Sequence, residues 1–525
     1  MLTRTIPGWC NNLQNPYWGA SLLPFRRLLR PAYANGVDSP RGDGANQFLP
    51  RPRDVSFPLH NIRDPTLAPN DGITLLVMQF GQFLDHDMFI TPEKEGVVGC
   101  CDDFVTISTS DPECRPIDVS NDPFYDQFGV KCLQFIRSTP VNPSCSGAPY
   151  REQQNNLTAY LDGSQIYGST YETSDELRDE TDPALLKISN FVEDTCTETC
   201  PLNFLPIRAN EEGEPEFFGE VRRVVSAVFQ QITYNEFLPI VIGTEATRNR
   251  NINIVQDGYW ETRYDPTIDA TAPNVFAAAL FRFGHTLIPD IFNLPNNVQV
   301  LLARSFFNHR RTITSGSSPS DFIRGIASHF AQKYDHIMVD SIVNKLFAEE
   351  PFNFGADLLA RNIMRAREHG IPGYNAWRSY ANLKTFSSFD ELRTVMSDPV
   401  VDFFAKVYRS VDDIDLFPAM ISENQDGKSL VGPLLRELFG ELFQRLKFGD
   451  RFWFENYNQP RPFTKNQLAS IRRTLMSSLI CAYTDATHVQ RYAMYAVSAN
   501  NPLIPCSELL KTGIIYDIRQ PYWHY

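Results

Sequence analysis

Three polar side chains interrupt an otherwise apolar stretch early in the chain. Residues 72–92 read GITLLVMQFGQFLDHDMFITP, and their apolar residues recur at the three- and four-residue spacing of a buried helix. Gln82 precedes Asp85 by three positions and His86 by four, so all three project from one side of that helix. Buried polar groups need partners, so the three either bond within the core or serve a site. Histidine readily takes up and returns a proton near neutral pH, which is the chemistry of a general acid–base site.

A second set of polar residues can be joined to the same helix. Asp87 follows His86 directly and therefore points to a different face. Residues 158–164, TAYLDGS, place oxygen-bearing side chains at every second position: Thr158, Tyr160, Asp162 and Ser164. An extended segment with this spacing aims alternate side chains one way, and such oxygen groups suit a hard cation, although an ordinary polar strand edge has the same pattern.

The elements that must position these residues are helices. A further helix-period apolar run, residues 276–288 (FAAALFRFGHTLI), carries a single histidine, His285. A histidine on such a face is commonly a hydrogen-bonded core residue, but a neutral imidazole also suits iron. A ligating histidine needs its second ring nitrogen held by an acceptor, which fixes the orientation of the ring.

Composition narrows the class of protein. The 525 residues are 42% hydrophobic and 12% aromatic, enough for a large core and unlike a disordered chain, and the length alone suggests several domains. The net charge of −14 argues against nucleic acid or an anionic membrane as a partner. Charged residues such as Arg282 and Glu236 interrupt every apolar run, so no membrane span is expected.

The cysteines point to an oxidising compartment. There are ten, most of them clustered: Cys10, Cys100, Cys101, Cys114, Cys132, Cys145, Cys196, Cys200, Cys481 and Cys506. Such clusters are typical of an extracellular disulfide framework, so we expect a secreted protein. The first ten residues contain no apolar signal-peptide region, so we expect the N-terminus to be that of a truncated, mature or partial chain.

The first 70 residues are rich in Pro, Asn, Gly and Arg and predict an extended arm with turns. The arm contains Arg41-Gly42-Asp43, the tripeptide that integrins bind. Three-residue matches arise often by chance, so this one is a weak indication of an adhesive partner.

GQFLDHD resembles the distal-histidine helix of the animal haem peroxidases, the superfamily of myeloperoxidase, peroxidasin and peroxinectin. The resemblance recurs in the family's order at LTAYLDGSQIYGS, RANE, FRFGHTLI, LLARNIMRAREHGIPGYNAWR and GDRFWFEN. It covers nearly the whole chain. The resemblance implies one large, mainly α domain with little β-structure, in which residues 1–70 form an N-terminal arm and residues 71–525 the catalytic domain.

The resemblance also implies roles on the distal side of a haem. His86 would act as base and then acid toward hydrogen peroxide, Arg208 of RANE would assist its cleavage, and Gln82 would position water or halide. Asp85 and Glu211 would form esters with haem b. Thr91 and Pro92 match the family's access loop.

On the proximal side the resemblance implies that His285 ligates the haem iron and that Asn362 holds its second nitrogen. Arg365 would pair with a haem propionate, and Glu368 stands where the family usually has Asp. The other histidines are predicted to be structural or at the surface: His60, His309, His329, His336, His369, His488 and His524.

By the same resemblance, Asp87 and residues 158–164 form a calcium site, with Tyr160 contributing its backbone carbonyl. Cys481 would pair with Cys506, and two bridges would form among Cys100, Cys101, Cys114 and Cys132. The partners of Cys10 and Cys145 stay open.

One departure from the family follows RANE. Relatives have a further helix and its connection between this element and the stretch that begins at Glu214, whereas here only Glu212 and Gly213 intervene. We therefore expect one helix-length segment to be missing, which could leave apolar surface uncovered. Glu212 replaces the methionine that myeloperoxidase links to haem, so no sulfonium bond is expected.

These observations predict a haem peroxidase that reduces hydrogen peroxide and oxidises phenolic or halide donors through an oxidised haem. The alternative is a peroxinectin-like adhesion or matrix protein whose catalysis is lost or secondary; the tripeptide and the missing segment favour it. A calcium-binding scaffold without haem would leave His285 and Asn362 unexplained.

Overall fold

Helices form the framework of the chain, and the strands are short. The computed structural model describes residues 3–43, 49–62, 72–142, 147–178, 186, 215–260, 264–306, 318–349, 351 and 353–512. The α-helices within these residues are α1 (Pro52–His60), α2 (Leu76–Met88), α4 (Ser164–Tyr167), α5 (Tyr171–Glu176), α6 (Pro215–Ile232), α7 (Thr244–Asn249), α8 (Asn274–Ala278), α10 (Pro319–Ser328), α11 (Asp340–Val343), α12 (Leu358–Glu368), α13 (Tyr374–Tyr380), α14 (Phe389–Leu392), α15 (Asp398–Val407), α16 (Leu416–Ile421), α17 (Pro433–Phe448), α18 (Lys465–Arg473), α19 (Met476–Tyr483) and α20 (Cys506–Thr512). The mainly helical fold expected from the sequence is confirmed.

Other helix types and short ladders connect these helices. The 3₁₀ segments are η1 (Tyr125–Phe128), η4 (Leu280–Leu287), η5 (Pro295–Asn297), η6 (Leu302–Arg304) and η7 (Val411–Asp413), and the π segments are η2 (Thr233–Phe237) and η3 (Pro239–Gly243). Five antiparallel ladders pair β1 (Leu23–Pro24) with β6 (Gln154–Asn155), β2 (Cys101–Asp102) with β3 (Thr106–Ile107), β4 (Ile117–Asp118) with β5 (Cys132–Leu133), β7 (Ile291–Asn293) with β8 (Gln299–Leu301), and β9 (His488–Gln490) with β10 (Leu503–Pro505).

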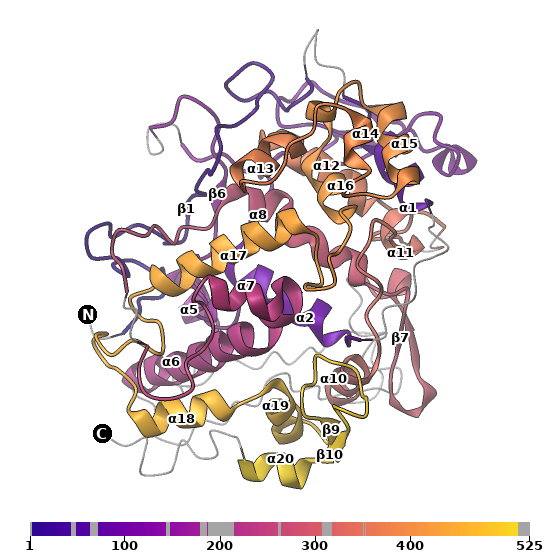
Figure 1. Cartoon of the computed structure of the whole chain (residues 1–525). Coiled ribbons are helices and arrows are strands. Elements are labelled where there is room, and N and C mark those ends of the chain that lie inside the picture. Colours follow the sequence, from indigo (N-terminus) through magenta and orange to yellow (C-terminus); the bar gives the residue numbers. More distant parts are fainter. Residues whose placement is uncertain are drawn as a thin grey trace.

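The core is built where the long helices meet. In Figure 1, α17 crosses the middle of the molecule, with α12 to α16 above it and α18 to α20 below it. The Phe439 ring of α17 lies 5.4 Å from that of Phe276 and 4.9 Å from that of Phe281, so α17 packs against α8 and η4. The ring centroids of Phe80 on α2 and Phe229 on α6 lie 5.6 Å apart. Aromatic packing thus fixes α2 and η4 relative to the rest of the helices.

Helix α2 follows the predicted pattern but is shorter than the apolar stretch. Before it, Ile73 and Thr74 form single β-bridges with Tyr495 and Phe330, so the helix begins only at Leu76. It ends at Met88 because the next residue adopts an extended conformation. The apolar residues that set the helical spacing are buried, both in α2 and just before it: Ile73, Leu76, Val77, Phe80 and Leu84.

The single helix expected over residues 276–288 is wrong. The chain forms α8, breaks at Ala279 (φ −145°, ψ −58°) and continues as η4. Arg282 Nε donates to the carbonyl of Ala277 at 2.9 Å, so a side chain takes the place of an intrahelical backbone donor at the break. The 3₁₀ half carries His285.

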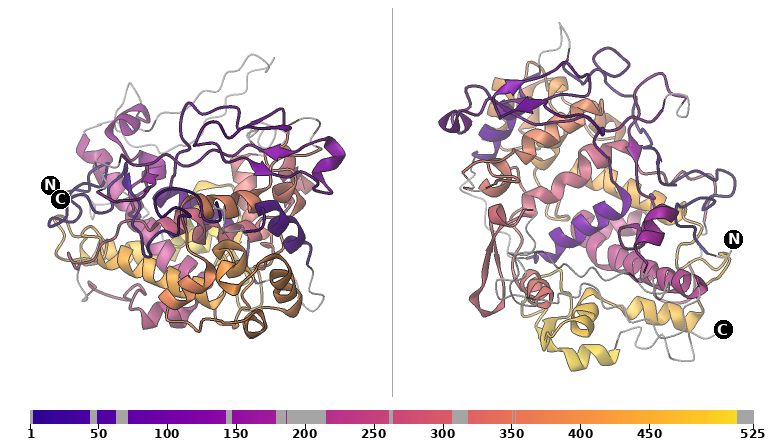
Figure 2. Two further views of the ribbon diagram at one scale, coloured as in Figure 1. Left: turned by 90° about the horizontal axis from the view of Figure 1, so that it is seen from above. Right: turned by 180° about the vertical axis from the view of Figure 1, so that it is seen from behind.

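The N-terminal part of the chain winds over the helices as extended segments and short ladders, seen in indigo and purple in Figure 2. Disulfides join Cys100 to Cys114, Cys101 to Cys132 and Cys481 to Cys506. The predicted pair of Cys481 and Cys506 and the two bridges predicted among the other four cysteines are confirmed, and the structure supplies the pairing of those four. Cys10 has no disulfide partner among the described residues. Three further cysteines lie outside those residues: Cys145, Cys196 and Cys200. None of the described helices is long and apolar enough to cross a lipid bilayer.

Candidate active site

A cavity of about 1170 Å³ lies between α2, η4 and α12. The cavity is lined by Gln82, Asp85 and His86 from α2, by His285 from η4 and by Arg365 from α12. Residues that the sequence places in three distant segments therefore share one space. Its size exceeds the usual range of small-molecule sites, so it can hold a large planar cofactor.

The polar face of α2 is turned into this cavity rather than into the core. His86 keeps 46% of its side chain exposed and Asp85 keeps 30%, while Leu84 between the polar positions is fully buried. Gln82 Oε1 accepts a hydrogen bond from Gln79 at 3.3 Å. Burial lowers the pKa of His86, so its imidazole is neutral and can accept a proton at pH 7. Burial raises the pKa of Asp85 to about 7, partly offset by a neighbouring guanidinium.

His285 faces the cavity from η4 in its neutral form. Burial, reinforced by the positive charge of Arg282, lowers its pKa to about 3. Asn362 Nδ2 lies 3.0 Å from His285 Nδ1, and Arg282 Nη1 donates to Asn362 Oδ1 at 2.8 Å. Asn362 is itself fully buried on α12. A metal-binding imidazole and an amide that orients it are therefore in contact.

One wall of the cavity is rich in arginine. Arg282, Arg361 and Arg365 all line it, opposed by Glu93. Glu93 Oε1 accepts from Arg365 at 2.7 Å and from Arg361 at 3.2 Å. The pKa of Arg282 is lowered to about 10 by burial and then by the like charges of Arg365 and Arg361. The positive charges of the three arginines therefore repel one another, and an anion placed among them would be stabilised.

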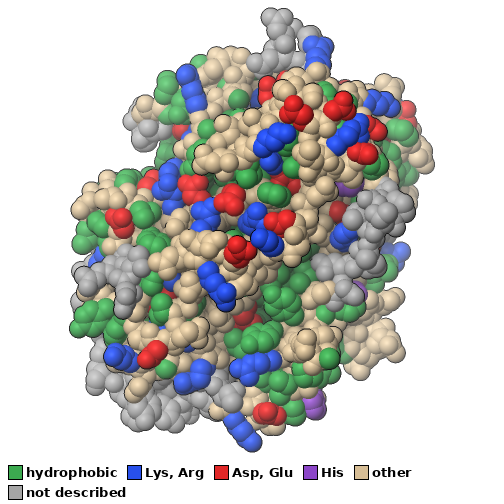
Figure 3. All heavy atoms as spheres, in the orientation of Figure 1, with side chains coloured by type: hydrophobic (Ala, Val, Ile, Leu, Met, Phe, Trp, Pro, Cys, Tyr) green, Lys and Arg blue, Asp and Glu red, His purple; other side chains and the backbone are tan. Residues whose placement is uncertain are grey.

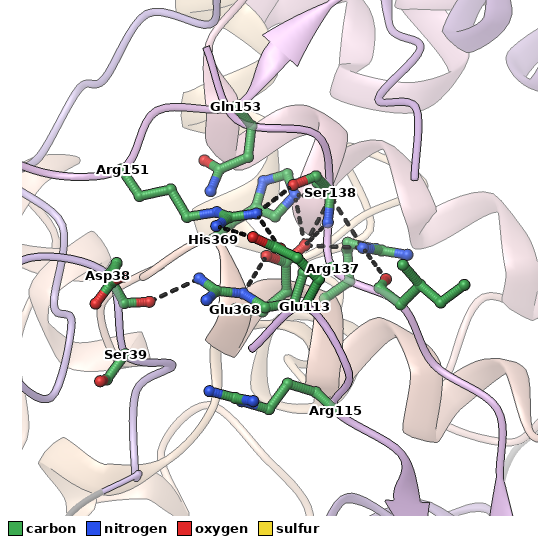
Figure 4. A network of polar contacts seen from close by, with 12 residues as sticks. Asp38, Ser39, Glu113, Arg115, Arg137, Ser138, Arg151, Gln153, Glu368 and His369 are labelled. Carbon is green, nitrogen blue, oxygen red and sulfur yellow. Dashed lines mark hydrogen bonds and ion pairs between the residues drawn. The ribbon is translucent and has the colours of Figure 1, made fainter. Parts of the chain in front are cut away.

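Arg365 is held by a buried network, of which Figure 4 shows Ser138, Glu368 and His369. Its Nη1 donates to Glu368 Oε1 at 2.8 Å and to Ser138 Oγ at 2.9 Å, and Ser138 Oγ in turn donates to Glu368 at 2.6 Å. His369 Nε2 lies 2.7 Å from the same hydroxyl, and the ring is fully buried. Its pKa falls to about 4, chiefly through burial. The acidic residue that departs from the family pattern, Glu368, therefore fixes the arginine.

The residues predicted to bind calcium lie together below the end of α2. Asp87 is fully buried, and its carboxylate accepts from the backbone N–H groups of Asp162, Gly163 and Gln165 at 3.2, 3.3 and 3.1 Å. Thr158 Oγ1 donates to Asp162 Oδ1 at 2.9 Å. Ser164 Oγ donates to the backbone carbonyl of Asp87, whereas the Tyr160 hydroxyl turns away to the carbonyl of Trp18.

The charges at this second site are close together. Burial and the nearby Asp162 raise the pKa of Asp87 to about 7. Arg222 Nη2 donates to Asp162 Oδ2 at 2.8 Å, and Arg4, which bonds Asp450 at 2.8 Å, approaches the same oxygen at 3.8 Å. Two carboxyl groups and neutral oxygens suit a hard cation, although no group of three acidic, His or Cys side chains that could hold a metal occurs among the described residues.

Two predicted site residues lie outside the described residues: Arg208, expected to be catalytic, and Glu211, expected to form an ester with haem. The tripeptide of the arm is described, and its arginine is not free. Arg41 Nη2 pairs with Asp415 at 2.7 Å with only 10% of its side chain exposed, while Asp43 lies 3.4 Å from Arg115.

Sequence reasoning missed three residues of the cavity: Arg282, Arg361 and Glu93. A signal existed for Arg361, which stands four residues, or one helical turn, before Arg365 and therefore shares its helix face. Arg282 stands three residues before His285. Glu93 follows the access segment, and nothing in its own neighbourhood predicts a pairing with α12.

The sequence matches the profile of the family described as animal haem peroxidase, at residues 3–213 and 207–494. It is 32% identical over 562 residues to human peroxidasin homolog, covering 93% of this chain and 37% of that protein. It is 31% identical over 586 residues to human myeloperoxidase, covering 96% of this chain and 75% of that one. The chain thus spans well under half the length of the peroxidasin homologs that it matches.

Solved structures show the same fold. Peroxidase A from Dictyostelium discoideum superposes with a TM-score of 0.70 at 23% identity, covering 95% of this chain and 99% of that one. The fatty acid alpha-dioxygenase of Oryza sativa superposes with a TM-score of 0.68 at 15% identity, covering 92% of this chain and 84% of that one.

Proposed function

The chain belongs to the animal haem peroxidase family, and from that premise we propose that it is an oxidoreductase that reduces hydrogen peroxide and oxidises phenolic or halide donors. One observation carries the proposal: His86 on α2 and His285 on η4 line the same cavity, with Asn362 in contact with His285. Membership of the family would also be compatible with a protein that has lost its catalytic activity. A retained pair of histidines, one oriented by a buried amide, argues for a working centre.

The cavity fits haem b. The neutral imidazole of His285 would hold the iron, and the arginine wall, Arg365 included, would hold the carboxylates at the edge of the macrocycle. Bound haem supplies the redox-active iron at which peroxide is reduced. Asp85 borders the cavity with a carboxyl group whose pKa is near neutral, and it would form one ester to haem; Glu211 would form the other.

Holding iron through Nε2 requires Nδ1 of His285 to carry the hydrogen and to donate it. Asn362 now presents its nitrogen to that atom because its oxygen accepts from Arg282. We expect the amide to turn over when haem is loaded, so that Oδ1 accepts from His285. A haem carboxylate would compensate Arg282 for the lost acceptor.

His86 would carry the proton. Its imidazole, neutral because burial lowers its pKa, takes a proton from hydrogen peroxide and returns it to the leaving oxygen. Arg208 would place a fixed positive charge beside the negative charge that develops during cleavage, and Gln82 would orient water or halide.

Calcium would occupy the site of Asp87, Thr158, Tyr160, Asp162 and Ser164. The ion would replace the proton that the raised pKa of Asp87 favours and would fix the end of α2. Because His86 is adjacent to Asp87, calcium would hold the proton-transfer residue in register.

The adhesive alternative is less well supported. Integrin binding would need an exposed Arg41-Gly42-Asp43, whereas the Arg41 side chain is buried against Asp415. We also propose that the chain is secreted, since three disulfides are formed.

A segment following Glu212 is proposed to be absent relative to the family. The profile matches in two pieces that meet at residues 207–213, and the alignment to human peroxidasin homolog is longer than this chain. The break between the two pieces supports a deletion at that point, and the longer alignment supports residues missing from this chain without locating them.

The test is an absorption spectrum of the protein expressed with haem, before and after one equivalent of hydrogen peroxide. A Soret band that shifts with peroxide and recovers with a phenolic donor supports the proposal. A Soret band indifferent to peroxide would instead favour the adhesive alternative, and failure to take up haem would contradict the haem site itself.

A further inference from the structure

Arg361 stands at the outer edge of the cavity. Its side chain is 22% exposed, compared with 10% for Arg365 one turn further along α12, and its partner Glu93 is 40% exposed. Ile90, which is 42% exposed, also borders the cavity, as does Leu358 three residues before Arg361. The lining of the cavity therefore combines a cation that solvent reaches with two apolar side chains.

The guanidinium of Arg361 has donors to spare. Its Nη1 donates to the carbonyl of Gln134 at 2.8 Å, and its Nη2 reaches Glu93 at 3.2 Å. Arginine offers five N–H donors, so these two contacts do not exhaust it. Arg365, in contrast, donates to Ile136, Ser138, Glu368 and Glu93 and is held in place.

The charge around Arg361 favours an incoming anion. Burial, followed by the like charge of Arg365, lowers the pKa of Arg361, and the opposite charge of Glu93 offsets this only in part. The whole protein carries a net charge of −14, and on the face shown in Figure 3 acidic and basic side chains are interspersed. A cluster of three arginines at one cavity is thus a local exception, and it would draw anions toward this mouth.

We propose that Arg361 selects reducing substrates that carry a carboxylate, with their aromatic ring against Ile90 and Leu358. This inference rests on the proposed peroxidase function and refines it. The other two arginines of the cavity, Arg282 and Arg365, would then bind the carboxylates of haem. Glu93 competes for Arg361 at its longer contact, so a planar carboxylate that forms two parallel hydrogen bonds can displace it.

The test uses a matched pair of phenols, 3-(4-hydroxyphenyl)propionate and its neutral amide, which differ only in charge. The Kd of each is measured by calorimetry on haem-loaded protein without peroxide, and kcat/KM is then measured with peroxide. Arg361→Met is compared with Arg361→Lys, and Arg393→Met, a surface arginine paired with Asp402, serves as the control.

In the wild type we expect the carboxylate to bind more tightly than the amide. Arg361→Met should reduce that preference about tenfold in both Kd and kcat/KM. Arg361→Lys should retain part of the preference, because a point charge remains. Arg393→Met should leave the preference at its wild-type value.

Three results would overturn the inference. An equal Kd for the two phenols in the wild type would remove the selectivity. An unchanged preference in Arg361→Met would place the selectivity elsewhere. Less haem per chain in Arg361→Met would assign this arginine to a haem carboxylate. Failure of the wild type to take up haem contradicts the proposed function itself, whereas uptake without selectivity contradicts only this inference.

Discussion

His285 Nδ1 lies 3.0 Å from the amide nitrogen of Asn362, a residue 77 positions further along the chain. The contact joins a 3₁₀ segment to a buried position of α12, so the imidazole cannot rotate without disturbing both elements. Orientation of this ring is the most specific requirement that the fold meets at the cavity.

Replacing Asn362 by Ala should leave haem bound but weaken the proximal ligand. Loss of such a partner typically costs ten- to a hundred-fold in affinity or activity, so we expect about that decrease in kcat/KM for hydrogen peroxide. The measurement is stopped-flow reduction of peroxide together with the Soret maximum. Asn249→Ala, on the exposed end of α7, is the matched control. Identical spectra and rates for the two variants would show that the amide plays no part.

Replacing His86 by Ala removes the proton carrier and leaves His285 in place. The rate of the peroxide reaction should fall by about two to four orders of magnitude, with the haem content unchanged. His488→Ala is the control, because His488 is exposed on β9 and is not among the residues that line the cavity. A variant that reacts at the wild-type rate would exclude His86 as the base.

Removal of calcium should destabilise the protein. A ligand that binds only the folded state adds about 2.7 kcal/mol to the free energy of unfolding when its free concentration is a hundred times its Kd. A chelator that removes the ligand should therefore lower Tm by a measurable amount. Asp87→Asn should abolish this response to the chelator, whereas Asp390→Asn, at an exposed position of α14, should retain it. If the wild type and Asp87→Asn have the same Tm with and without calcium, the ion does not bind there.

Glu236 gives a prediction for pH. This carboxyl group is 5% exposed in η2, its Oε1 accepts from the backbone of Met476 at 2.8 Å, and burial raises its pKa to about 8. The folded state therefore keeps its proton at a pH where the unfolded state has lost it, and the free energy of unfolding falls as pH rises from about 4.5 to 8.

Glu236→Gln removes that titration while keeping the acceptor for Met476. The free energy of unfolding of the variant should match that of the wild type near pH 4.5 and should exceed it increasingly toward pH 8. Each unit of pKa shift contributes about 1.4 kcal/mol at most to this difference. Thermal unfolding of both proteins across this range provides the measurement. A constant difference in Tm between them would mean that Glu236 titrates normally.

Local patterns in the sequence predicted the face of α2 well. The apolar residues that recur at helical spacing are buried, and Gln82, Asp85 and His86 emerge together on the other side. Periodicity carries this information because the two faces of one helix differ within a few residues. The same periodicity failed at Ala279, where the guanidinium of Arg282 takes a backbone carbonyl and a 3₁₀ turn follows.

Contacts between distant segments could not be predicted from periodicity. Arg361 and Glu93 are 268 positions apart, and only the packing of α12 beside the access segment brings them together. The calcium site was predicted because Asp87 shares a helix with His86 and because residues 158–164 carry an alternating pattern of oxygen groups; the site stays a prediction. For Arg208 and Glu211 the prediction rests on the resemblance alone.

Arg4 and Asp450 form a hydrogen bond although they are 446 positions apart in the sequence. Arg4 also places its positive charge beside the carboxylate of Asp162. Arg4 is synthesised long before Asp450. The polar surroundings of Asp162 can therefore be completed only after the chain has been made as far as Asp450, which follows α17. A calcium ion bound there, as proposed, would reach its final surroundings only after α17 has been synthesised, although α2 is made much earlier.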